Sequence, residues 1–373
     1  MTNGWRGGEI LPVTRMKTGV PGLDAVLGGG LPAGRTCLIA GPPGTGKTTL
    51  GNQLAFAHAA AGGLVVFATL LAEAHDVMLQ NIRDFTFFDR SLPGDRVRYL
   101  NLLSDLEEGG LDRVAATIRR EIRESGTNLL IVDGIGVIDD VAVSSLDVRH
   151  FAQQLDALAG LLGCTTVLLS DPGPGEARRL GAQLNGMVLL TNEREGARNV
   201  RLLEVAKLRG AHHVGGTHEF AINESGVTIY PRLESLSGQR RAEVVATDGL
   251  GTGVAALDTM LGGGLKPLSS TMVLGTPGAG KTLLGLTFLA EGARNGERGL
   301  MASFHEPPQA IATTADRIGL DLTRHIDAGM VRILWNPPLE LSVDAWAWQL
   351  LEVAARDRPQ RVFIDALTDV QQF

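Results

Sequence analysis

The chain has 373 residues, 44% hydrophobic and 20% charged, which predicts a soluble globular protein of two or three domains. Its net charge of −7 and the lack of any basic block argue against a dedicated nucleic-acid binder. No apolar run is long enough to cross a bilayer and residues 1–12 lack an export signal, so we expect a cytoplasmic protein. The two cysteines, Cys37 and Cys164, lie in apolar strand-like runs and are expected to be buried and reduced.

The sequence contains one long internal repeat. Residues 18–34 read TGVPGLDAVLGGGLPAG and residues 252–265 read TGVAALDTMLGGGL, an offset of 234 residues. The same offset aligns Lys47 with Lys281. A period this long indicates a duplicated domain, because solenoid repeats are far shorter.

The polar stretch 237–245 predicts the boundary between the two copies. We therefore expect one domain over residues 13–243 and another over residues 244–373. The first copy continues for about 110 residues beyond Asp133, whereas only eight residues follow the equivalent Asp365. The second domain is therefore expected to be truncated, without several strands of its sheet.

Short β-rich runs alternate with helical patterns in each copy, which is typical of a mostly parallel sheet flanked by helices. In the first copy, a helix is expected over 48–61, ending at Gly62 and Gly63. The strands expected there span 36–40, 64–69, 97–101, 128–132, 165–169, 188–192 and 200–207, and a β-rich stretch covers 217–230. The second copy is expected to have strands at 272–274, 299–304, 331–335 and 361–364, and a helix ending at 294. The fold class predicted is α/β.

Two glycine-rich loops fit the pattern G-x4-G-K-[ST], each between an expected strand and an expected helix. The glycines let backbone N–H groups turn toward a phosphate, and the helix adds its positive end. The residues expected to bind the phosphates are Gly41, Gly44, Thr45, Gly46, Lys47, Thr48, Thr49, Gly275, Gly278, Ala279, Gly280, Lys281, Thr282 and Leu283. The pattern predicts ATP as ligand, with Mg²⁺ held in part by Thr48 and Thr282.

Lysine usage supports these loops independently. Only five of the 34 basic residues are lysines, so the composition favours arginine at a basic position. Two of the five are Lys47 and Lys281, where a compact ammonium fits and a planar guanidinium does not. We expect both to bridge the β- and γ-phosphates.

Carboxylates follow two further strands in each copy. The runs LLIVD and RVFID end in Asp133 and Asp365, which can hold Mg²⁺ directly or through water beside a phosphate loop. Glu73 and Glu306 end the strand after the loop's helix, where a general base can act on the attacking water. The alternative for these two glutamates is a solvated acid that starts the next helix.

In order, spacing and duplication, these motifs resemble the KaiC family of RecA-like ATPases over residues 17–373. The resemblance extends to the motif KLRG, which begins at Lys207. It implies a homo-oligomeric ring, typically a hexamer, with ATP between neighbouring subunits. It also implies that Lys207 and Arg209 reach the neighbour's nucleotide; the alternative is two exposed basic residues on a β-hairpin.

The chain departs from the family pattern at one position of each copy. KaiC proteins carry two adjacent glutamates at the strand end, whereas this chain has Ala72 and His305 before Glu73 and Glu306. Turnover is therefore expected to be slow or to depend on the two remaining glutamates. The segment that carries phosphorylated Ser and Thr in clock proteins of the family corresponds to positions beyond residue 373.

The sequence thus predicts a KaiC-like ATPase that hydrolyses ATP to ADP at subunit interfaces of a ring. Its expected role is a signalling or circadian-type regulator that acts with an unidentified protein partner. Three alternatives stay open: a Ser/Thr autokinase using the same sites, a DNA recombination or repair ATPase, and a nucleotide-stabilised scaffold with negligible turnover. The acidic balance argues against DNA, and Ala72 and His305 favour the scaffold.

Overall fold

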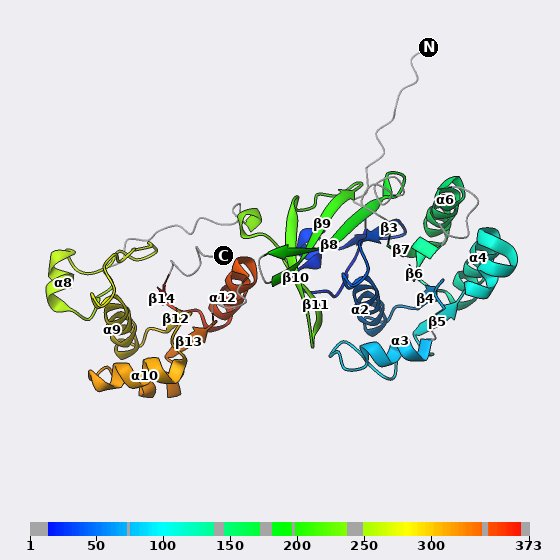
Figure 1. Cartoon of the computed structure of the whole chain (residues 1–373). Helices are drawn as coiled ribbons and strands as arrows, with labels where there is room; N and C mark the ends of the chain where they lie inside the picture. Colours follow the sequence, from blue (N-terminus) through cyan, green and yellow to red (C-terminus); the bar gives the residue numbers. More distant parts are fainter. Residues whose placement is uncertain are drawn as a thin grey trace, which may run out of the picture. The chain divides into compact units, whose positions relative to one another are not determined.

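The chain divides into two compact units, Met1–Ser235 and Leu236–Phe373 (Figure 1). Both units alternate strands with helices, so the expected α/β fold class is confirmed. No helix among the described residues is both long and apolar enough to span a membrane. The computed structural model describes residues 14–72, 75–137, 145–171, 181–195, 198–236, 249–337 and 342–366.

Within its described residues, the first unit is built on a nine-stranded sheet. Its strands are β3 (Thr36–Ala40), β4 (Val65–Thr69), β5 (Val97–Asn101), β6 (Leu129–Asp133), β7 (Thr165–Ser170), β8 (Gly186–Glu195), β9 (Arg198–Leu208), β10 (Thr217–Asn223) and β11 (Gly226–Tyr230). Their order across the sheet is β11-β10-β9-β8-β3-β7-β6-β4-β5. The strands from β5 to β8 run parallel, and β9, β10 and β11 extend the sheet antiparallel. Every strand expected in this copy is present, and the stretch 217–230 is divided between β10 and β11.

Helices cover both faces of this sheet (Figure 1). They are α1 (Leu23–Val26), α2 (Lys47–Ala60), α3 (His75–Ile82), α4 (Leu103–Ser125) and α6 (Ser145–Leu162), with short 3-10 helices η1 (Ile135–Val137) and η2 (Leu233–Leu236). In β3, Cys37 and Ile39 join the apolar cluster of α2 and α3, whereas Leu38 and Ala40 join that of α4 and α6. Both faces of the strand are therefore buried, which explains its unbroken apolar run.

The two cysteines are free and buried, as the sequence predicts. Burial raises the pKa of both Cys37 and Cys164 to about 12. Because the thiolate is the reactive form, we expect neither thiol to be alkylated by iodoacetamide at pH 8 in the folded protein. Mass spectrometry should show no adduct under native conditions and two adducts in guanidinium chloride. A native adduct on either residue would contradict this description of the core.

A threonine–aspartate contact closes the opening motif of each copy. The hydroxyl of Thr18 donates to Asp24 Oδ1 at 2.8 Å, and that of Thr252 donates to Asp258 Oδ1 at 2.7 Å. Segment 18–24 packs directly on α2, because a Cβ added to Gly19 would lie 2.4 Å from that of Ala57. Residues 18–24, which we call the staple, therefore hold the chain against α2, the helix that follows the phosphate loop.

This segment and α1, which overlaps its end, are also hydrogen-bonded to the part of the chain that forms the antiparallel strands. The N–H of Val214 donates to the carbonyl oxygen of Val26 at 2.8 Å, and the N–H of Ile229 donates to that of Pro21 at 2.9 Å. A small antiparallel pair, β1 (Arg15–Met16) and β2 (Leu31–Pro32), flanks it.

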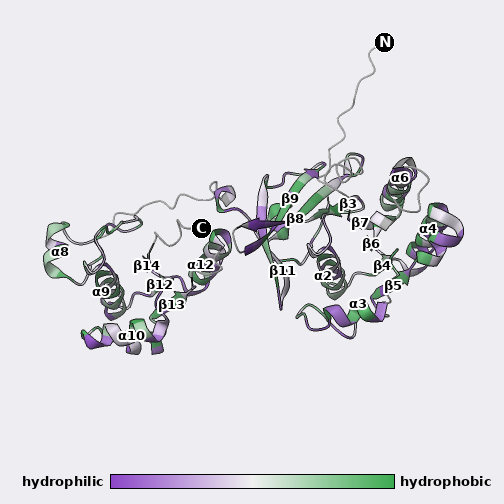
Figure 2. Ribbon diagram, viewed as in Figure 1, coloured by the Kyte–Doolittle hydropathy of each residue, from purple (hydrophilic) through white to green (hydrophobic). Residues whose placement is uncertain are grey.

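The described residues of the second unit include three parallel strands in the order β13-β12-β14. They are β12 (Gly299–Ser303), β13 (Val331–Trp335) and β14 (Arg361–Asp365), and the helices are α8 (Ala255–Met260), α9 (Lys281–Arg294), α10 (Pro308–Arg317), α11 (Leu322–Asp327) and α12 (Val343–Asp357). Helices such as α10 carry both hydrophilic and hydrophobic residues (Figure 2), and α10 buries Ile311 and Ala315. This amphipathic pattern is that of a helix packed on a sheet.

The strand expected at 272–274 is absent, so that prediction was wrong. Met272 and Leu274 are 67% and 84% exposed. Their counterpart in the first unit is β3, which lies between β7 and β8. In the described part of the second unit, no strand pairs with residues 272–274. The apolar pattern is the same in both copies, but a strand forms only where neighbouring strands satisfy its backbone groups.

Candidate active site

The glycine-rich loop between β3 and α2 is the centre of the site in the first unit. Gly46 has a φ of 95°, which L side chains rarely adopt, and it caps the N-terminus of α2. Helix α2 begins at Lys47. The loop therefore brings backbone N–H groups and the positive helix end to one place, as anion binding requires.

The ammonium group of Lys47 is buried and has three partners. Its Nζ donates to the carbonyl oxygens of Gly41 and Pro42, both at 2.8 Å, and forms an ion pair with the carboxylate of Asp171. The Lys47 side chain is 7% exposed and that of Asp171 52%. An ammonium group has three protons to donate, so these acceptors account for all of them.

Thr48 and Asp133 meet beside this lysine. The Thr48 hydroxyl donates to Asp133 Oδ2 at 2.7 Å, and the carboxylate is buried at the end of β6. Burial raises the pKa of Asp133, and the hydrogen bond from Thr48 opposes that shift. A hydroxyl and a carboxylate oxygen in contact are hard ligands that fit Mg²⁺, so these two side chains would hold the ion.

The second unit repeats this arrangement. Lys281 Nζ donates to the carbonyl oxygens of Gly275 and Thr276 at 2.8 and 2.9 Å. The Thr282 hydroxyl donates to Asp365 Oδ2 at 2.7 Å. Both copies thus place a lysine, a hydroxyl and a carboxylate together, although the second loop is mostly exposed.

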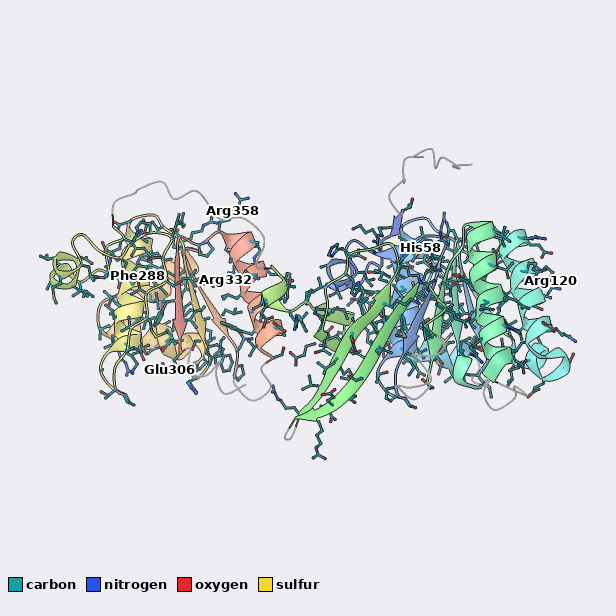
Figure 3. The ribbon with its side chains drawn as sticks, turned by 90° about the horizontal axis from the view of Figure 1, so that it is seen from above. His58, Arg120, Phe288, Glu306, Arg332 and Arg358 are labelled. Atoms are coloured by element: carbon teal, nitrogen blue, oxygen red, sulfur yellow. The ribbon has the colours of Figure 1, made fainter. Side chains whose placement is uncertain are left out.

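Of the two strand-end glutamates, the structure describes one. Glu306 is exposed and follows β12 (Figure 3), and its carbonyl oxygen accepts a hydrogen bond from the Ser303 hydroxyl at 2.9 Å. The register pairs Ser303 with Asp365, so Glu306 lies at the same sheet edge as that carboxylate. Glu73 lies outside the described residues, and its role stays a prediction.

Lys207 and Arg209 contact their own subunit at a different place. Lys207 Nζ donates to the carbonyl oxygen of Gly181 at 3.1 Å and also to that of Ala182. Arg209 donates to the Ala182 carbonyl oxygen at 3.5 Å. Partial burial, and to a lesser degree the charge of Arg209, lowers the pKa of Lys207.

The strand register separates this pair of cations from the phosphate loop of the same unit. Lys207 pairs with Met187, which pairs in turn with Leu38 of β3. Leu38 precedes Gly41 by three residues, roughly 10 Å along a strand. The structure therefore does not bring Lys207 and Arg209 together with Lys47, Thr48 and Asp133 of one chain.

Asp171 is a site residue that the sequence analysis missed. It directly follows β7, in the run TTVLLSD, and so obeys the same rule of an apolar strand followed by aspartate that identified Asp133. The pattern of the sequence therefore carries a signal for Asp171, although not for its contact with Lys47.

Comparison with known proteins shows which family this chain is similar to. The family model "ATPase: KaiC" matches residues 16–234 and 250–372. The "Circadian clock oscillator protein KaiC" of Picosynechococcus is 29% identical, with 97% of this chain and 72% of that protein covered. Proteins of the same name from Acaryochloris marina and Synechococcus elongatus are 29% and 28% identical, covering 95% and 99% of this chain and 70% and 72% of theirs.

Proposed function

Because the chain belongs to the KaiC family of ATPases, we propose that it binds Mg²⁺–ATP at both glycine-rich loops and hydrolyses it to ADP. The observation that carries this proposal is the repeated contact of loop hydroxyl and strand-end aspartate, Thr48 with Asp133 and Thr282 with Asp365, each beside a loop lysine. We take residues 13–243 and 244–373 as the two ATPase domains.

In the first domain, each side chain has a distinct task. Lys47 would contact the β- and γ-phosphates, and Thr48 and Asp133 would hold the metal ion. When bound, Mg²⁺ neutralises part of the phosphate charge. Glu73 would orient the attacking water and accept its proton. The corresponding residues of the second domain are Lys281, Thr282, Asp365 and Glu306.

We further propose that the working form is a homo-oligomeric ring, a hexamer, in which Lys207 and Arg209 complete the neighbour's site. Their contacts with Gly181 and Ala182, away from the loop of their own unit, support a role in trans. Cations supplied in this way neutralise charge that develops on the transferred phosphate. The names of the relatives, circadian clock oscillator proteins, support a role as a timing regulator. We propose in addition that the protein is cytoplasmic and acts with a protein partner.

Steady-state ADP release by the whole chain tests this function. Glu73→Gln is expected to lower first-domain turnover by roughly 10²–10⁴, because the amide keeps the shape of the side chain and loses its basicity. Equilibrium ATP binding should stay within about twofold, since the loop is intact. Glu306→Gln, made separately, reports on the second domain.

The same assay distinguishes the scaffold alternative, which Ala72 and His305 favour because each stands where the family has a glutamate. ATP binding without ADP release by the unmodified chain would establish the scaffold and refute hydrolysis. Unchanged turnover in both glutamine variants would instead remove the proton-accepting role from Glu73 and Glu306.

A further inference from the structure

Asp171 follows the strand that separates β3, which leads into the phosphate loop, from β6, which ends in Asp133. Strand β7 lies between β3 and β6 and pairs Ser170 with Ala40. The N–H of Gly41 donates to the carbonyl oxygen of Ser170 at 3.2 Å, which fastens the start of the loop to the end of β7. Asp171 is the next residue, so its carboxylate is held beside the loop by backbone pairing.

The two copies differ in how their loop lysines are bonded. Both donate to two carbonyl oxygens of their own loop. Lys47 adds the ion pair with Asp171, whereas Lys281 has no carboxylate within ion-pair distance in the described part of the second unit. The third bond of Lys47 thus depends on Asp171, which follows β7, and not on the sequence of the loop.

A terminal phosphate and Asp171 require the same proton donor. A loop lysine reaches the β- and γ-phosphates of a bound triphosphate, and its ammonium group has only three protons. All three are already donated within the protein, so the β-phosphate of any nucleotide replaces one of these bonds and the γ-phosphate of a triphosphate replaces a second. The ion pair with Asp171 is the bond that the γ-phosphate breaks, because the Asp171 carboxylate and the γ-phosphate are both anionic and repel each other at close range.

We propose that Asp171 is a positioning residue for Lys47. Its carboxylate competes with the γ-phosphate for the lysine ammonium group and forms the ion pair again when that phosphate leaves. This inference rests on the proposed ATPase function. It predicts that Asp171 lowers affinity for a triphosphate more than for a diphosphate, since ADP leaves one lysine proton free for the carboxylate. A side chain with a purely structural role would alter both affinities alike.

Calorimetric titration with AMP-PNP and with ADP tests the inference on the whole chain, in a Lys281→Ala background that silences the second loop. Asp171→Asn is expected to raise AMP-PNP affinity about fivefold, the effect of an ion pair with a partly exposed partner. ADP affinity should rise by less than about twofold, so that the ratio of the two affinities shifts toward the triphosphate.

Two control variants isolate the charge at this position. Asp171→Glu keeps the carboxylate and should keep the affinity ratio close to that of the parent, and Asp95→Asn removes an exposed carboxylate far from the loop and should change nothing. Asp171→Ser repeats the test if the asparagine variant does not fold. Equal shifts for both nucleotides, no shift, or a glutamate variant that behaves like asparagine would overturn the inference. If neither nucleotide binds the Lys281→Ala parent, the proposed function itself is refuted.

Discussion

Replacing Lys47 with alanine is expected to weaken ATP binding at the first loop by about 100-fold or more, because it removes charged hydrogen bonds worth roughly 3 kcal/mol. The effect should also appear as lost stabilisation. At a ligand concentration of about 100 Kd, ATP adds roughly 2.7 kcal/mol to the free energy of unfolding of a protein that binds it, by mass action. Thermal unfolding of the whole chain with and without Mg²⁺–ATP, in the Lys281→Ala background, measures both quantities.

The chain offers a matched control for this substitution. Lys266 is exposed and lies outside both loops, so Lys266→Ala should leave the ATP-induced rise in Tm unchanged. Because Lys47 is buried against Gly41 and Pro42, the variant's Tm without ATP must be compared as well. A folded Lys47→Ala protein that keeps the parent affinity at the first loop would contradict its assignment as a phosphate-binding loop.

In the Lys281→Ala background, Arg209→Ala is expected to lower first-domain ATP turnover by roughly 10³-fold, the effect of removing a cation that acts in trans in related phosphoryl transfers. ATP affinity should change little, since the phosphate loop is intact and a cation in this role acts on charge that develops during phosphoryl transfer. Mixing this variant with Lys47→Ala subunits should restore part of the activity, because each supplies the half of the shared site that the other lacks. ADP release at increasing ratios of the two variants measures the recovery.

A substitution on the far side of the same unit controls for loss of positive charge. Arg120 is an exposed residue of α4 (Figure 3), and Arg120→Ala should leave turnover unaffected. Co-assembly of the mixed subunits has to be shown first, by chemical cross-linking of differently labelled chains. A co-assembled mixture with no more activity than its components would refute the shared site and leave Lys207 and Arg209 as surface residues.

Features fixed over short stretches of sequence were predictable. The sequence predicts a helix over 48–61 directly after the glycine-rich loop, and α2 spans Lys47–Ala60. Asp133 follows from a regularity of parallel sheets, in which the ends of neighbouring strands meet at one edge. The structure brings Thr48 and Asp133 into contact, whereas their part in catalysis stays a prediction.

Features that depend on distant partners were not predictable. Residues 272–274 have the apolar pattern of a strand, but strand formation depends on neighbours that pattern alone does not reveal. The ion pair between Lys47 and Asp171 joins residues far apart in the chain, and its existence depends on the placement of β7 between β3 and β6. Likewise, the KLRG motif identifies Lys207 without indicating that its ammonium contacts Gly181 and Ala182.

The staple formed by residues 18–24 has a mechanical consequence. Gly19 leaves no space between this segment and Ala57 of α2, and Val26 is bonded to the backbone of Val214, five residues beyond Arg209. Helix α2, whose first turn would bind the phosphates, is therefore connected through this short, tightly packed segment to the residues beyond the end of β9, where Arg209 lies. If the proposed ring forms, a shift of α2 in one subunit would have a packed route to the cation proposed to act on the neighbour's nucleotide, through contacts within a single chain.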